Sequence, residues 1–191
     1  MVHSERHEMK ILMAAIIVLT GAFAQAADKP QSANDLQSIS ALDVPRYMGT
    51  WYEIAKFPAW FQKKCVSDTR AEYTLQPDGR VQVINRCRQD GGEMKEALGS
   101  GRQIGGAASS KLEVRFAPAW LAFLPAVWGN YWVIDLDPAY QLAAVSEPKR
   151  EYLWILSRSA KVDPAAYDAL LARLSRQGFD LQRLEKTLQR D

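Results

Sequence analysis

The chain has 191 residues, of which 48% are hydrophobic and 24% charged, a balance typical of one globular domain and not of a disordered chain. Its net charge of +2 excludes the strong basic field expected of a nucleic-acid-binding protein. The histidines, His3 and His7, precede an apolar N-terminal run. If that run is a leader that is removed, the mature chain has no histidine for a nucleophile pair, a metal or a haem.

Residues 1–26 are predicted to form a secretory signal. Lys10 supplies a positive charge, residues 11–19 are a short apolar core, and Ala24-Gln25-Ala26 offers small residues for cleavage. The core is too short to span a bilayer. Either Met1 or Met9 would start such a segment.

Ala27 and Asp28 stand where a lipoprotein signal would place a cysteine. We therefore expect an exported, soluble periplasmic protein without a lipid anchor, peripheral at most to the outer membrane. Residues 27–41 are rich in Asn, Ser and Gln and are predicted to form a flexible linker. The domain itself is expected over residues 42–191.

A short helical turn is predicted at residues 42–48, and from Gly49 onward apolar and polar residues alternate as in strands. Tight turns such as Gln76-Pro77-Asp78-Gly79 separate the apolar runs. Eight short strands with regular turns indicate an all-β sandwich or an up-and-down barrel. The barrel is favoured, because closure removes the exposed edges of an open sheet. The predicted strands are residues 50–57, 69–75, 81–87, 93–104, 111–116, 130–136, 142–146 and 151–157.

A C-terminal helix follows the predicted strands. Asp163 supplies a capping side chain, Pro164 suits the first turn, and Gly178 is placed to end the helix. The apolar stripe indicates that this helix packs on the outside of the barrel. The stripe consists of Tyr167, Leu170, Leu171 and Leu174.

Three sequence blocks in this order resemble those of the lipocalin family. They are Gly49-Thr50-Trp51-Tyr52, Asp135-Leu136-Asp137-Pro138-Ala139-Tyr140 and Leu153-Trp154-Ile155-Leu156-Ser157-Arg158. Tyr131-Trp132-Val133-Ile134 makes the chain similar to the bacterial outer-membrane, apolipoprotein D-like group. The resemblance implies an eight-stranded antiparallel barrel with one open mouth and an interior that holds a lipophilic molecule. It also implies binding, storage or transport of fatty acids or lysophospholipids for maintenance of the envelope.

Counting strand reversals assigns every connection to one end of such a barrel. Trp51 and Arg158 meet at the closed end, where we expect the guanidinium to stack on the indole ring as a structural latch. Cys65 and Cys87 meet at the open end, and a disulfide between them is expected in an oxidising compartment; two independent thiols are the alternative. Strict hairpin register places Asp68 opposite Cys87, so this bridge requires the connection to fold back.

Two connections at the open end carry apolar residues that water should not cover. A lid over the cavity, a homodimer contact and a surface that dips into a bilayer explain them equally well. Lys63 and Lys64 would suit anionic headgroups in the last case. The residues concerned are Trp60, Phe61, Trp120, Leu121, Phe123 and Trp128.

Inward positions of the strands give a candidate ligand-binding lining. Periodicity alone favours a close-packed interior, whereas the family resemblance implies a hollow one. Tyrosines and an asparagine among these residues could orient a headgroup. The candidate lining is Ala55, Phe57, Tyr73, Val83, Asn85, Val114, Phe116, Tyr131, Val133, Tyr152 and Trp154.

No catalytic, cofactor or metal site is predicted. Glu53 shares the inward face of Trp51, where an ion pair with an arginine is a better explanation than catalysis. The alternatives to a lipid carrier are an enzyme acting on a lipophilic substrate, with a free Cys65 or Cys87 as nucleophile, and a dimerisation module with a filled core.

Overall fold

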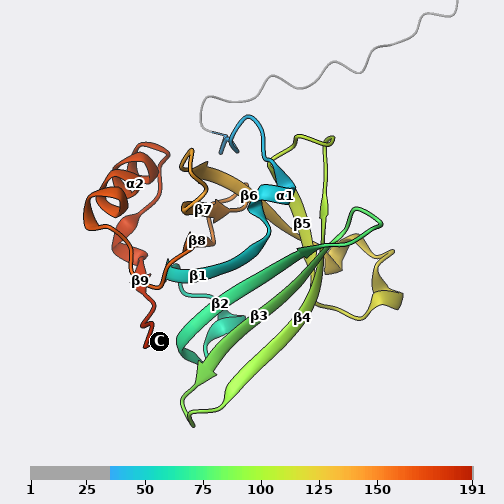
Figure 1. Ribbon diagram of the computed structural model, residues 1–191, viewed down its shortest axis with the longest axis horizontal. Coiled ribbons are helices and arrows are strands. Elements are labelled where there is room, and N and C mark those ends of the chain that lie inside the picture. The colour runs from blue at the N-terminus through green and yellow to red at the C-terminus, as the bar shows by residue number, and fades with distance from the viewer. Residues whose placement is uncertain (1–34, 191) are drawn as a thin grey trace, which may run out of the picture. The chain divides into compact units, whose positions relative to one another are not determined.

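The computed structural model describes residues 35–190 and shows a β-barrel with one long helix against its outer face (Figure 1). The helices and 3-10 turns are α1 (Val44–Tyr47), η1 (Trp60–Gln62), η2 (Ala119–Leu121), η3 (Pro125–Val127), α2 (Pro164–Arg176) and η4 (Leu181–Arg183). The strands are β1 (Gly49–Lys56), β2 (Cys65–Leu75), β3 (Val81–Gln89), β4 (Met94–Gln103), β5 (Lys111–Arg115), β6 (Gly129–Leu136), β7 (Leu142–Ser146), β8 (Leu153–Ser157) and β9 (Glu185–Lys186).

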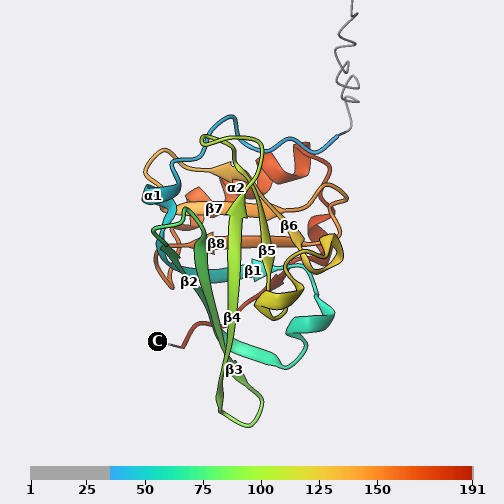
Figure 2. The ribbon, with the colours of Figure 1, turned by 90° about the vertical axis from the view of Figure 1, so that its right-hand side faces the viewer.

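Each of the strands β1 to β8 is antiparallel to its neighbours along the chain, and β1 pairs with both β2 and β8. The predicted eight-stranded up-and-down barrel is therefore confirmed, and the hairpins follow one another around its wall (Figure 2). Seven predicted strands agree with the observed ones to within two residues at both ends. The largest difference is at β2, which starts four residues before the predicted Thr69.

One end of the barrel is closed by α1 and by the latch predicted from the sequence. The Arg158 guanidinium lies 4.0 Å from the centre of the Trp51 ring. It also donates hydrogen bonds to the backbone oxygens of Thr50, Arg46 and Tyr47, at 2.9, 3.0 and 3.1 Å. Gly49 has a φ of +96°, and a Cβ there would lie 3.2 Å from Arg158 Nη1, which explains the glycine at this position.

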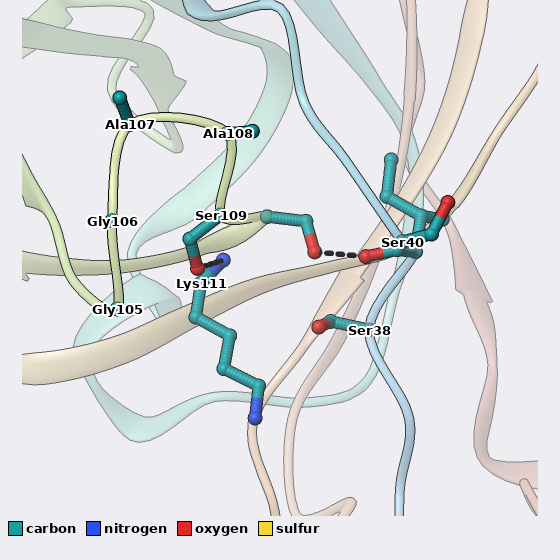
Figure 3. Close-up of a pocket in the computed structure, with 10 residues that line it drawn as sticks. Ser38, Ser40, Gly105, Gly106, Ala107, Ala108, Ser109 and Lys111 are labelled. Carbon is teal, nitrogen blue, oxygen red and sulfur yellow. Dashed lines mark hydrogen bonds between the residues drawn. The ribbon is translucent and has the colours of Figure 1, made fainter.

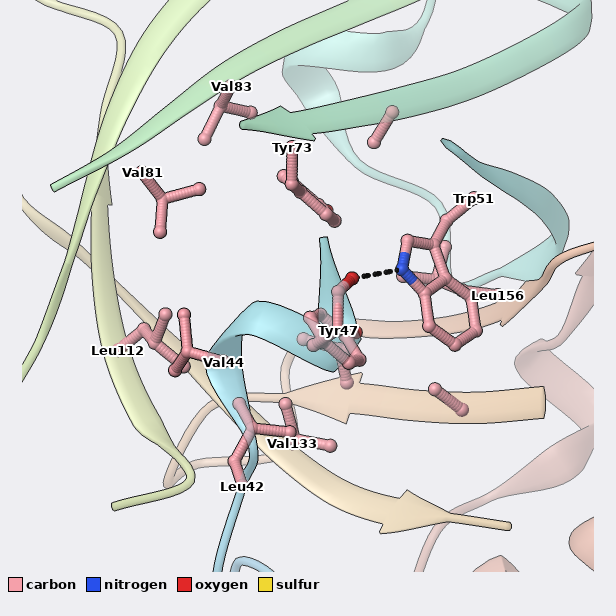
Figure 4. Packing of buried hydrophobic residues seen from close by; sticks show 13 residues of the cluster. Leu42, Val44, Tyr47, Trp51, Tyr73, Val81, Val83, Leu112, Val133 and Leu156 are labelled. Carbon is pink, nitrogen blue, oxygen red and sulfur yellow. Dashed lines mark hydrogen bonds between the residues drawn. The ribbon is translucent and has the colours of Figure 1, made fainter. Parts of the chain in front are cut away.

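A core cluster fills the barrel interior next to this closed end (Figure 4). Trp51 is fully buried in this cluster and donates its indole hydrogen to the Tyr47 backbone oxygen at 2.8 Å. Aliphatic side chains from both sides of the barrel pack around the rings of Trp51 and Tyr47. They include Val44, Val81, Val83, Leu112, Val133 and Leu156.

A second core cluster lies between the outer face of the sheet and α2. Leu170 and Leu174 of α2 are fully buried in it, as the predicted stripe requires. Arg173 adds a bidentate salt bridge to Asp135 of β6, with nitrogen–oxygen distances of 2.7 and 2.9 Å. The predicted helix and its external position are thus confirmed.

Ala55 and Phe57 belong to this outer cluster, so the prediction that they line the interior is wrong. The register of β1 against β8 shifts between Glu53 and Ala55, where Ile54 is an extra residue. Such a bulge reverses the alternation of faces, which turns the residues after it toward α2. Phe57 packs edge-on against Phe179, with ring centres 6.2 Å apart.

The described part of the predicted linker is not loose. Leu36 is buried in the outer cluster, and the Ile39 amide donates to the Val133 backbone oxygen at 2.9 Å. Ser110 also donates its hydroxyl hydrogen to the Ile39 backbone oxygen. Residues 35–41 therefore pack against the barrel. The predicted signal over 1–26 and the first part of the linker lie outside the described residues.

Cys65 and Cys87 form the expected disulfide, with Cα atoms 5.5 Å apart. The chain does not fold back to make it. Instead, β2 continues to Cys65 and loses register twice against β3, before and after Ser67. These shifts place Cys65 opposite Gln89 and within reach of Cys87.

The C-terminal residues complete the barrel wall where β1 and β2 separate. Direct pairing of these strands ends at Tyr52 and Arg70. Beyond that point the Thr187 amide donates to the Ile54 oxygen, and the Leu188 oxygen accepts from the Asp68 amide, at 2.9 and 2.8 Å. The Gln189 side chain bridges the Glu53 and Thr69 oxygens. We call residues 185–190 the seam segment. No helix within residues 35–190 is long and apolar enough to cross a membrane.

Candidate functional site

The interior next to the closed end is packed too tightly for a lipid. A cavity of about 10 Å³ remains there, roughly the space of one water molecule. Val133, also predicted as lining, is fully buried. Four predicted lining residues surround this cavity, namely Tyr73, Val83, Val114 and Tyr131.

Three tyrosines meet at this packed level. The Tyr131 hydroxyl lies 2.9 Å from that of Tyr47 and 3.0 Å from that of Tyr73. Burial raises the pKa of all three phenols, that of Tyr73 to about 12. They are therefore neutral at physiological pH and act as hydrogen-bonding groups, not as bases.

The remaining candidate lining residues lie toward the other end, which is the mouth in the predicted topology. Phe116 is 45% exposed there, and Asn85, Tyr152 and Trp154 are partly exposed. Gly99 makes room for the Phe116 ring, because a Cβ at Gly99 would lie 2.7 Å from a ring carbon. Three aromatic rings and one amide of the candidate lining are thus accessible to solvent toward the mouth.

The turn η1 reaches into this mouth from the connection between β1 and β2. Phe61 is 50% exposed, and its ring centre lies 5.6 Å from that of Tyr152 and 6.3 Å from that of Trp154. The Gln62 carboxamide enters more deeply. Its nitrogen donates to Glu53 Oε2 at 2.8 Å, and its oxygen accepts from the Trp154 indole at 3.0 Å.

Glu53 therefore has different partners from those predicted. Within residues 35–190 no arginine pairs with it; Gln62 and the Thr187 hydroxyl donate to its two oxygens. Burial raises the pKa of Glu53, and these hydrogen bonds offset only part of that effect. Sequence reasoning missed Gln62 and Thr187, since both lie outside the predicted strands.

The mouth also carries the large exposed side chains expected from the sequence. Trp60, Trp120 and Phe123 are 73%, 72% and 75% exposed, and Leu121 is partly exposed. Trp128 differs, because it is half-buried. Its indole donates to the Ala122 oxygen at 2.8 Å, and the Arg102 guanidinium covers its ring at 4.1 Å.

A separate groove of about 420 Å³ lies at the closed end, between residues 38–40 and the turn from β4 to β5 (Figure 3). Serine hydroxyls, two glycines and the Lys111 stem surround it. It contains none of the predicted lining residues. Its serines already support the turn: Ser109 accepts from the Lys111 amide, and Ser110 donates to Ile39.

Neither Cys65 nor Cys87 can act as a nucleophile, because both thiols are consumed in the disulfide. Within the described residues no group of three or more histidine, cysteine or acidic side chains could hold a metal ion. The mouth offers apolar surface, one buried carboxylate and hydrogen-bond donors. That set of groups suits binding of a lipophilic molecule with a small polar head.

Comparisons with known proteins agree with this geometry. A family model for a lipocalin-like domain matches residues 42–189. The chain is 42% identical to temperature-induced lipocalin-1 of Arabidopsis thaliana over 161 residues, which is 82% of this chain and 84% of that protein. It is 33% identical to outer membrane lipoprotein Blc of Escherichia coli (90% and 94% covered) and 31% identical to apolipoprotein D of Mus musculus (76% of each).

Solved structures share the fold at lower sequence identity. Insecticyanin from the tobacco hornworm Manduca sexta matches with a TM-score of 0.63 at 20% identity, covering 80% of this chain and 84% of that one. Lobster apocrustacyanin A1 matches with a TM-score of 0.60 at 14% identity, covering 84% and 93%. Together with the barrel, its latch and the matched family model, these likenesses show that the chain belongs to the lipocalin family.

Proposed function

We propose that this protein binds and carries a monoacyl lipid, either a fatty acid or a lysophospholipid, in the mouth half of its barrel. Lipocalins generally bind or transport small hydrophobic ligands. The observation that carries the proposal is the contrast between the two halves of the interior. The half next to the latch is closed and full, whereas Phe116, Tyr152 and Trp154 leave apolar surface accessible from the mouth.

Burial of the acyl chain would drive binding. Each methylene removed from water contributes about 0.8 kcal/mol, so a chain inserted among aromatic rings gains affinity with length until it meets the packed level. The mouth residues proposed to contact it are Asn85, Phe116, Tyr152 and Trp154. Of the other predicted lining residues, Tyr73, Val83, Val114 and Tyr131 would form the base of the site, and Val133 would support them.

We further propose that the protein takes up its cargo at the surface of a bilayer. Trp60, Trp120 and Phe123 are more than two-thirds exposed at the mouth, and Lys63 and Lys64 follow η1 directly. Tryptophan suits the membrane–water interface, and lysine is attracted to anionic headgroups. The proposed place of action is the cell envelope, with the protein exported to the periplasm. Two relatives named above bear on this proposal, since one is called an outer membrane lipoprotein and the other an apolipoprotein.

Native mass spectrometry of the protein purified from its own host, followed by extraction of the bound material, tests the carrier function. A co-purified monoacyl lipid is the expected result. Titration with the same lipid should show that Trp154→Ala binds at least 10-fold more weakly, with an unchanged circular dichroism spectrum. Trp120→Ala is the matched control, because Trp120 is exposed outside the interior. If the Trp154→Ala variant binds the lipid as tightly as the wild type, Trp154 does not line the binding site.

Liposome flotation tests the membrane contact. Binding to anionic vesicles that weakens with salt is expected, and it should fall when Trp60 and Trp120 are both replaced by serine. Association of monomers that is insensitive to salt, with no vesicle binding, would instead assign the exposed residues to a homodimer. That result would refute membrane uptake and leave the carrier function intact.

A further inference from the structure

Glu53 is a buried carboxylate inside the barrel that forms no salt bridge within residues 35–190. Its side chain is 3% exposed. Lys56, the base that acts on it electrostatically, pairs instead with Glu185, with Nζ and Oε2 3.1 Å apart. A carboxylate taken out of water destabilises the fold unless hydrogen-bond donors satisfy it. Here the Thr187 hydroxyl satisfies one oxygen at 2.6 Å and the Gln62 amide satisfies the other at 2.8 Å.

The two donors to Glu53 differ in how firmly the fold holds them. Thr187 belongs to the seam segment, and its amide is hydrogen-bonded to β1. Gln62 belongs to η1, a single 3-10 turn without a side-chain cap and with no fully buried residue. Its neighbour Phe61 is half-exposed. The Gln62 carboxamide is therefore a loop group inserted into the barrel, and movement of η1 alone would withdraw it.

Withdrawal of Gln62 would leave an acceptor and a donor facing one space. Glu53 Oε2 would lose its amide hydrogen, and the Trp154 indole would lose its acceptor oxygen. Both groups belong to the barrel wall: Glu53 lies in β1 and Trp154 in β8, and these two strands pair with each other. Buried polar groups require partners, so whatever replaces Gln62 must donate to one and accept from the other.

We propose that Glu53 and Trp154 form a subsite for the polar head of the carried lipid, and that the Gln62 carboxamide occupies this subsite in the empty protein. This proposal rests on the lipid-carrier function. The group that fits this subsite is uncharged and holds a hydrogen-bond donor next to a carbonyl. A primary amide has this arrangement, and so does the hydroxyl beside the ester of a monoacylated glycerol.

An ionised fatty acid does not fit the subsite. Its head offers only acceptors, so it cannot donate to Glu53, and its negative charge would face a second carboxylate at low dielectric. A methyl ester lacks the charge but also lacks the donor. The subsite therefore excludes ionised fatty acids from the proposed cargo and favours lipids with an amide or with a hydroxyl beside the ester, an arrangement that 1-acyl lysophospholipids share.

Four lipids with the same 18-carbon chain separate head recognition from chain burial. They are oleamide, 1-oleoylglycerol, oleate and methyl oleate, each titrated into delipidated protein at pH 7.5 by isothermal calorimetry. A fifth titration uses 1-oleoyl lysophosphatidylethanolamine, which should bind more tightly than oleate because its glycerol also holds a hydroxyl beside the ester. The expected result is at least 10-fold tighter binding of oleamide and 1-oleoylglycerol than of oleate and methyl oleate.

Glu53→Gln should reduce the preference for oleamide over oleate at least fivefold while changing the affinity for methyl oleate less than twofold. The matched control is Glu93→Gln, which removes the same charge from an exposed position in the turn between β3 and β4. The control should keep the order of the four lipids. A Glu53→Gln variant with the wild-type order would overturn the proposal.

Gln62→Ala gives an independent measurement if Glu53→Gln folds poorly. Removing the internal occupant should tighten oleamide binding severalfold, because the ligand no longer competes with the carboxamide. If Gln62 only supports the structure of the mouth, its removal should weaken oleamide binding. That result would overturn the subsite. Equal affinities for all four lipids would overturn the subsite and leave the carrier function standing. No binding of any lipid would refute both.

Discussion

Replacement of Arg158 by lysine tests whether the latch stabilises the barrel through geometry as well as charge. The guanidinium lies 4.0 Å from the Trp51 ring centre and donates to four backbone oxygens, the fourth being that of Tyr140 at 3.3 Å. Lysine keeps the charge, but its compact ammonium cannot cover the indole and also reach oxygens on three separate segments.

The expected loss in free energy of unfolding follows from the contacts of Arg158 that lysine cannot make. Stacking of a shielded cation on an indole contributes about 1 to 2 kcal/mol. Loss of one or two hydrogen bonds to backbone oxygens removes about 1 kcal/mol each. We therefore expect Arg158→Lys to lower the free energy of unfolding by about 3 kcal/mol. Urea denaturation at 25 °C, followed by tryptophan fluorescence and by circular dichroism, measures this difference.

Arg102→Lys is the matched control, because Arg102 also covers an indole, that of Trp128, at 4.1 Å. The Arg102 side chain is 47% exposed and pairs with Glu113 at the surface. Solvent screens such contacts, so we expect this variant to lose less than about 1 kcal/mol. If Arg158→Lys is no more destabilising than Arg102→Lys, the latch contributes charge alone and the reasoning fails.

Three further predictions concern other parts of the fold. Leu170→Ala should lower the free energy of unfolding by about 3 kcal/mol, since it leaves a cavity between α2 and the sheet; a loss below 1 kcal/mol in urea denaturation would show that α2 docks without it. Cys87→Ser should cost about 3 kcal/mol, because the bridge to Cys65 closes a loop with a sequence separation of 22; identical urea midpoints with and without the bridge would count against this value. Asp68 and Glu53 should give opposite pH dependences. Burial alone would raise the pKa of Asp68, but its hydrogen bonds lower it below 3.8, so its stabilisation is present above pH 3.8 and lost as the pH falls. The raised pKa of Glu53 means that the folded state holds its proton above pH 4.5, so stability relative to Glu53→Gln decreases as the pH rises through that value. Denaturation midpoints of Asp68→Asn and Glu53→Gln between pH 3 and 8 measure both trends, and parallel curves would contradict them.

The elements of the barrel could be predicted because each one depends on local patterns. Alternation marks the strands, Asp163 and Pro164 mark the start of α2, and reversal of direction at each turn assigns Trp51 and Arg158 to one end. These signals act over a few residues, or follow from counting strands. The family blocks then fixed the choice of a closed barrel.

The wrong predictions have physical causes that alternation does not encode. One extra residue, Ile54, turns Ala55 and Phe57 away from the interior, although both stand at every second position counted from Trp51. The partners of Glu53 are 9 and 134 residues away, on segments with no strand pattern. The separation of a packed closed half from an open mouth depends on the packing of large side chains that come from different strands.

The seam segment has a consequence for how the protein folds. Its contacts with β1 and β2 join residues separated by 120 to 136 positions. Closing so long a loop costs chain entropy before any contact repays it, and proteins dominated by such pairings fold slowly. The wall around the mouth can therefore form only after nearly the whole domain has been synthesised. Until then β1 and β2 present unpaired edges, so the nascent chain depends on remaining unfolded or shielded.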